Sequence, residues 1–139
     1  DNEYSQKDEL IKLMLLEVNC GSTRNPKVKV VLEYKDKEIE KVESGNGPVD
    51  SIFKAINSVI SNSAKLELFL INAVTKGTDA QAEVSVRLKE KDISVSGTAS
   101  DTDTMVASAK AYIIALNKLI LKRKKRNSDL NLSTNKKIR

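Results

Sequence analysis

Two short segments of the sequence hold the residues best suited to bind a small charged ligand. They are residues 44–50 (SGNGPVD) and 100–106 (SDTDTMV), which lie 56 positions apart. Each segment closes a strand-rich stretch and opens a helical pattern. The first turn of a helix presents unpaired backbone N–H groups and a partial positive charge. A related pair of helix entrances therefore predicts a site for a small anionic ligand, and it favours a sensor over an enzyme.

The residue types that drive most enzyme chemistry are scarce. The chain has no histidine and a single cysteine, Cys20, which excludes Cys/His zinc sites, Ser-His-Asp triads and Cys-His pairs. Asp79, Asp101 and Asp103 could bind Mg²⁺ or exchange protons, although Asp before an apolar helical run is also typical of a helix cap. Cys20 allows no disulfide within the chain, and we expect a buried, inert thiol.

The positive charge is concentrated at one end of the chain. The formal net charge is +5, but residues 122–139 hold eight Lys/Arg against one Asp, while residues 1–121 hold sixteen against eighteen acids. We expect residues 122–139 to form a basic, disordered tail, and we expect no nucleic-acid partner. Binding of nucleic acid or an acidic partner through residues 122–126 stays open as an alternative. No apolar run predicts a membrane span, and no signal peptide is visible, so we expect a cytoplasmic protein.

The first half of the chain reads as three strands and a helix. Residues 11–18 form a largely apolar strand, and residues 21–26 have turn chemistry. Residues 27–34 alternate as a half-buried strand does, and residues 38–43 give a weaker third strand. After residue 48 the apolar period changes to that of a helix, with one face formed by Val49, Ile52, Phe53, Ile56, Val59 and Ile60.

The second half repeats this plan at a constant offset of 56 residues. A strand over 66–74 is followed by a turn at 75–77, an alternating strand and a third strand at 93–95. Residues 97–103 cross to a helix whose stripe includes Met105, Tyr112 and Leu116. The sequence predicts an α+β fold of two pseudosymmetric βββα units, residues 10–62 and 66–121, packed into one dimeric domain after a connecting segment at residues 1–9.

Three motifs, taken together, resemble one known family. They are residues 45–50 (GNGPVD), residues 77–84 (GTDAQAEV), and residues 101–104 (DTDT) followed by ASAKAY at 107–112 and ALN at 115–117. In this order and spacing they are similar to the C-terminal regulatory domain of 2-isopropylmalate synthases, a domain type that also serves citramalate and homocitrate synthases. The resemblance runs from about residue 10 to 121.

The resemblance implies a regulatory part without catalysis of its own. In the family, an N-terminal (β/α)₈ barrel holds a divalent metal through a His-x-His pair and an acid, and it condenses acetyl-CoA with a 2-oxo acid. The His-x-His pair cannot occur in this sequence, because it has no histidine. We therefore expect no cofactor in this part, and we expect the catalytic barrel, a second copy of the chain and an effector amino acid as its partners.

The resemblance also implies where that effector, the end product leucine, would bind. Carried over to this sequence, the loop residues would wrap the amino-acid backbone, small and apolar residues would line the side-chain pocket, and two threonines would contact the polar end. These residues are Gly45, Asn46, Gly47, Val49 and Asp50 for the loop; Leu66, Phe69, Ala73, Ala80 and Ala82 for the pocket; and Thr102 and Thr104 at the second entrance. Several of them could equally be turn or core residues.

Other effectors and a different class of function remain open at this point. Citramalate synthases imply isoleucine, and homocitrate synthases imply lysine. A domain of this fold could also serve only to dimerise, without sensing any ligand. Leucine is the effector that the spelling of the second and third motifs favours.

Overall fold

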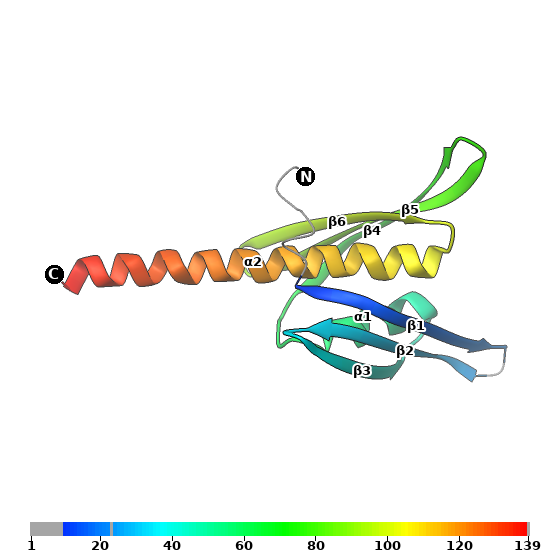
Figure 1. Cartoon of the computed structure of the whole chain (residues 1–139), viewed down its shortest axis with the longest axis horizontal. Helices are drawn as coiled ribbons and strands as arrows, with labels where there is room; N and C mark the ends of the chain where they lie inside the picture. The colour runs from blue at the N-terminus through cyan, green and yellow to red at the C-terminus, as the bar shows by residue number, and fades with distance from the viewer. Residues whose placement is uncertain (1–9, 23, 139) are drawn as a thin grey trace.

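Two three-stranded antiparallel sheets enclose two helices (Figure 1). The computed structural model of the protein describes residues 10–22 and 24–138. The elements in chain order are β1 (Ile11–Gly21), β2 (Arg24–Tyr34), β3 (Lys37–Ser44), α1 (Pro48–Asn57), β4 (Lys65–Lys76), β5 (Asp79–Glu90), β6 (Ile93–Asp101) and α2 (Thr104–Ile138). The prediction of an α+β fold with two βββα units is confirmed.

In the first unit, α1 packs on β2 and β3. The alternation in β2 buries Val28, Val30 and Leu32 completely, as the period of two predicts. The predicted turn at residues 21–26 is shorter than expected, because β1 continues to Gly21 and β2 begins at Arg24, and these two residues face each other across the ladder. Backbone pairing along the ladder outweighs the turn preference of Asn25 and Pro26.

Cys20 is exposed, so the prediction of a buried thiol is wrong. The side chains of residues 19–22 are all exposed, because this end of β1 extends beyond the core.

In the second unit, α2 lies on β5 and β6, and it also reaches β1 of the first unit. The backbones of β6 and α2 approach very closely at Gly97. A Cβ atom added there would clash with the carbonyl oxygen of Ala111 and lie 2.7 Å from the backbone nitrogen of Ala115. Only glycine leaves room for this contact. Strand β6 runs on to Asp101, well past the predicted end at residue 95.

The helices end elsewhere than the sequence predicted. Helix α1 stops at Asn57, although Val59 and Ile60 still pack against the core. Residues 122–138, expected to be a disordered tail, continue α2 as one helix (Figure 1). The chain has no Gly or Pro after Gly97 to end that helix. By length and composition α2 could cross a membrane, but its most apolar stretch is 61% buried within the molecule, as expected of a core helix.

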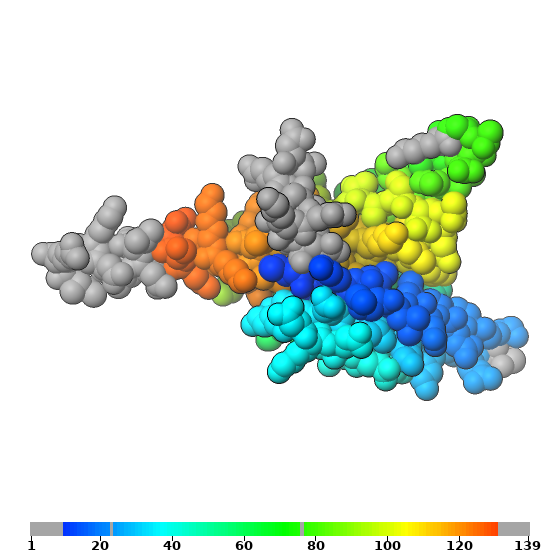
Figure 2. Space-filling model, viewed as in Figure 1, coloured from blue at the N-terminus to red at the C-terminus, as the bar shows by residue number. Residues whose placement is uncertain are grey.

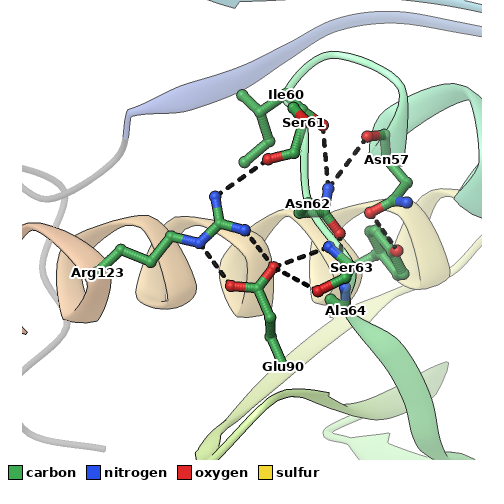
Figure 3. Close-up of polar contacts among 9 residues, drawn as sticks. Asn57, Ile60, Ser61, Asn62, Ser63, Ala64, Glu90 and Arg123 are labelled. Carbon is green, nitrogen blue, oxygen red and sulfur yellow. Dashed lines mark hydrogen bonds and ion pairs between the residues drawn. The ribbon is translucent and has the colours of Figure 1, made fainter.

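A polar network ties the connection between the units to α2 (Figure 3). The buried carboxylate of Glu90 binds the guanidinium of Arg123 and accepts a 2.8 Å hydrogen bond from the Ser63 backbone N–H. Arg123 also donates to the Ser61 carbonyl oxygen at 3.2 Å. The hydrogen bond from Arg123 is the main cause that lowers the pKa of Glu90. The connection between the units is therefore held by a charged side chain from the region expected to be a tail.

Candidate functional site

The entrance to α1 is a loop of small residues whose helix end has no side-chain cap. Gly47 is the N-cap residue, in an extended conformation with φ of −152°, and no side chain accepts a hydrogen bond from the first turn. Pro48 has no N–H, so the N–H groups of Val49 and Asp50 are the donors that this first turn can offer. The Ser51 N–H already donates to the Gly47 carbonyl oxygen at 3.0 Å.

The two glycines of this loop differ in what surrounds them. Gly45 is buried, and a Cβ atom added there would clash with the Asp50 carboxylate and lie 2.9 Å from the Ser51 hydroxyl. At Gly47 an added Cβ atom would meet nothing within 4 Å. A larger residue at Gly45 would thus have to displace the side chains of Asp50 and Ser51. Gly47 leaves open space in front of the helix end, as a bound ligand would need.

The carboxylate of Asp50 lies against Gly45 and Asn46, at the entrance to α1. It accepts a hydrogen bond from the Asn46 N–H at 3.4 Å and pairs with Lys54 at 3.3 Å. Its side chain is about half exposed, at 48%. A carboxylate in this position offers an acceptor for a ligand ammonium group, beside backbone N–H groups that suit a ligand carboxylate.

The entrance to α2 is filled by its own carboxylates. Asp103 accepts hydrogen bonds from the N–H groups of Met105, at 2.8 Å, and Val106, at 3.4 Å. Asp101 accepts from the Asp103 N–H at 2.9 Å and pairs with Lys110 at 3.2 Å. The backbone hydrogen bond from Asp103, followed by that of Lys110, lowers the pKa of Asp101. The N–H groups of Met105 and Val106 are therefore already occupied by a carboxylate of the same helix end.

The predicted residues of the second entrance lie together. Thr102 is exposed and Thr104 half-buried at the start of α2. Ala82 faces Asp101 across the β5–β6 ladder, which places it beside them. Ala73 faces Ala82 in turn on β4. These positions adjoin the α2 entrance, whereas the loop of residues 45–50 forms the α1 entrance.

The predicted apolar wall is an open face of β4. Leu66, Phe69, Ile71 and Ala73 each lie opposite an apolar residue of β5 and so share its inner face. Neither helix covers this strand, because α2 lies over β5 and β6. Leu66 is consequently 48% exposed and Ile71 47% exposed. Ala80, on the hairpin of β4 and β5 that projects from the body (Figure 2), is exposed as well.

An aromatic cluster connects this wall to α1. The ring of Phe53 stacks on Tyr112 at 4.5 Å between centroids and meets the edge of Phe69 at 5.7 Å. The Tyr112 hydroxyl donates to the Asn57 side-chain oxygen at 3.1 Å, and burial raises the pKa of Tyr112 to about 12. The sequence analysis placed Phe53 and Tyr112 only in apolar helix stripes.

Two cavities in the described part of the chain lie away from these residues. One of about 700 Å³ lies between the inter-unit connection and the extended part of α2, lined by Ser63, Glu90, Lys91, Arg123 and others. A second, of about 430 Å³, lies on the neighbouring side of α2 near Ile93 and Leu130. In a single copy all the predicted effector residues except the buried Gly45 are exposed or half-buried. Within the described ranges, no three Cys, Asp or Glu side chains gather as a metal site requires.

Comparison with known proteins gives a consistent set of relatives. A family model described as the LeuA allosteric (dimerisation) domain matches residues 1–120. The chain is 48% identical over 126 residues to a 2-isopropylmalate synthase of Rhodopseudomonas palustris strain BisA53, covering 90% of this chain. It is 50% identical over 117 residues to that of Bradyrhizobium sp. strain BTAi1, covering 83% of this chain. These matches span only 24% and 22% of the relatives' own lengths.

Proposed function

Because the chain belongs to the family of LeuA allosteric (dimerisation) domains, we propose that it senses leucine for a 2-isopropylmalate synthase. The whole enzyme would condense acetyl-CoA with 2-oxoisovalerate in a barrel with a divalent metal, and leucine would inhibit it as the end product. Leucine can act only by binding one state of the enzyme more tightly than another, with a typical coupling of about 1–3 kcal/mol.

The uncapped entrance of α1 is the observation that carries this proposal. A leucine carboxylate would accept from the Val49 and Asp50 N–H groups, and its ammonium group would pair with the Asp50 carboxylate. The isobutyl group needs an apolar wall, which Phe69 and the exposed inner face of β4 offer. Thr102, Thr104, Ala73, Ala80 and Ala82 would contribute from the second entrance.

A second copy of the chain would complete the site. The dimerisation named for the family supports a homodimer, and the inner face of β4 offers an apolar surface for it. Covering this face would bury Leu66 and Ile71, which are each about half exposed in one copy. Burial of apolar area is worth about 25 cal/mol per Å². The pocket would then be enclosed only in the dimer.

Calorimetric titration of the purified chain tests the proposal. We expect leucine to release or absorb heat at one site per copy in the presence of EDTA, with weaker signals for isoleucine, valine and lysine. Tighter binding of isoleucine or lysine would identify a different effector. No heat with any of the four would overturn the sensor function.

A dimerisation module without ligand sensing is the second candidate, favoured by the exposed apolar face of β4. It predicts a dimer in sedimentation whose thermal unfolding ignores amino acids. A micromolar leucine site would instead stabilise the domain by about 4 kcal/mol at millimolar leucine. The two candidates therefore differ by a thermal shift of many degrees.

A further inference from the structure

The basic run at residues 122–126 divides between two sides of α2. Arg123 and Arg126 bind carboxylates at the start and end of the β5–β6 turn, which fixes one side against the second sheet. Lys124 and Lys125 are exposed, and Lys125 also borders the smaller cavity together with Asp92 and Asp129. Among the described residues, no carboxylate pairs with either of them. We call these two lysines the basic face of α2.

Positive charge is also crowded next to that face. The pKa of Lys118 is lowered, first by partial burial and then by the neighbouring charge of Lys122. Lys122 itself donates to the Ser94 carbonyl oxygen at 3.4 Å, on the side of the second sheet. Positive charge thus also lies along α2 before Lys124 and Lys125.

The chain enters the described fold beside the basic face. The side chain of Asn117, fully buried in α2, accepts a 2.8 Å hydrogen bond from the Ile11 N–H and donates to the Ile11 carbonyl oxygen at 3.1 Å. With 3.6 residues per turn, Lys124 lies about two turns beyond Asn117 on the same side of the helix, about 11 Å along its axis. Lys125 lies about 80° further round the helix from Asn117. This clasp fixes where residues 1–9 leave the fold.

We propose that residues 1–9 dock along the basic face of α2. This segment, which lies outside the described residues, carries four carboxylates against one lysine. When extended, nine residues reach at most about 30 Å, well beyond the distance required. Attachment at Ile11 keeps the segment at a high effective concentration, which lets individually weak exposed ion pairs act together. The docking sets the direction in which the chain approaches β1, whether or not the domain binds leucine.

Paramagnetic broadening in NMR spectra of the full 139-residue chain tests this docking. A nitroxide is attached to Ser5→Cys in a Cys20→Ser background, since Cys20 is the only native thiol. We expect the amide signals of residues 121–128 to be lost selectively. At about 1 M salt, where the Debye length falls to about 3 Å, the signals should return. The Asp8→Lys/Glu9→Lys variant should also restore them.

Charge exchange and mixing complete the test. Combining Asp8→Lys/Glu9→Lys with Lys124→Glu/Lys125→Glu should bring the broadening back. The control Lys27→Glu/Lys37→Glu, on the exposed ends of β2 and β3, should leave the broadening unchanged. Absence of broadening in the parent chain would overturn the proposal. So would broadening found only when a spin-labelled copy is mixed with an isotope-labelled one, because that places a second copy's segment on the helix.

Discussion

The entrances of α1 and α2 occupy equivalent positions in the repeat but are built from opposite chemistry. At α2, Asp103 supplies the carboxylate that its own helix end requires. At α1, the corresponding residue is Gly47, and the helix end has no side-chain cap. The two copies of the unit therefore differ in one respect: one helix end is capped by its own side chain, and the other is not. The second unit caps its own helix, whereas the first leaves the N–H groups of its first turn without a side-chain partner.

The close packing of α2 on β6 in the second unit predicts the largest effect, a loss of stability. Gly97→Ala places a Cβ atom against backbone atoms of Ala111 and Ala115, which cannot move without shifting α2. We expect a loss of about 3 kcal/mol or more in the free energy of unfolding, measured by urea denaturation. Ser94→Ala, at an exposed position of the same strand, is the matched control and should change little. A Gly97→Ala domain as stable as the parent would contradict the close packing of α2.

Giving α1 the cap of α2 should remove the difference between the entrances. Gly47→Asp would supply a carboxylate to the N–H groups of the first turn, since Gly47 has extended backbone and free space for a side chain. We expect the domain to become slightly more stable, by a few tenths of a kcal/mol. Leucine affinity, measured by calorimetry, should fall about thirtyfold or more, because a charged hydrogen-bonded contact is worth about 2 kcal/mol. Unchanged leucine affinity would mean that the α1 end does not hold the ligand.

The reverse change, Asp103→Ala, should open the α2 entrance. Loss of an N-cap costs about 1 kcal/mol, which thermal unfolding would reveal as a lower Tm. Asp103→Ser should recover most of this loss. Leucine affinity should stay the same within error. A drop comparable to that of Gly47→Asp would mean that the ligand carboxylate binds at the entrance of α2 and not at that of α1.

The smallest predicted effect is on the stability of the domain at acidic pH. The Asp103 N–H and Lys110 lower the pKa of Asp101 in the folded state, so the carboxylate stabilises the fold above its unfolded pKa, near 3.8, and this contribution is lost as the pH falls through the folded pKa. Asp101→Asn should therefore flatten the fall in stability below about pH 4. Glu90, whose pKa is lowered separately by Arg123, keeps its own acid dependence in both proteins. Identical acid profiles would contradict the ion pair at the α2 entrance.

Periodic features of the sequence predicted the fold well. The 56-residue offset and the alternation of Val28, Val30 and Leu32 were enough for two βββα units, because burial follows the side-chain period. The ends of elements were less predictable: the paired ladder carried β1 through Gly21, against local turn preference. The helical course of residues 122–138 depends on the absence of helix breakers and on Arg123 reaching Glu90, a contact 33 residues distant.

The sequence predicted the residue types of the candidate site better than the role of each residue. The sequence located both entrances, and it distinguished a neutral loop from an acidic one. It gave helix capping as one of two uses of Asp103, which the structure confirms, but it could not choose between them because capping and ligand binding use the same residue types. The clasp between Asn117 and Ile11 was also missed, although a lone polar residue within the apolar stripe of α2 was a signal for it.

The backbone amide signals of the two entrances provide the most direct test of the central claim. In NMR spectra recorded during a leucine titration, we predict that the largest shifts fall on Val49 and Asp50, at the uncapped end of α1. Met105 and Val106, whose N–H groups already donate to Asp103, should shift little. Leucinamide, which lacks the carboxylate, should fail to reproduce the pattern. Shifts confined to Met105 and Val106, or equal shifts with leucinamide, would contradict the account.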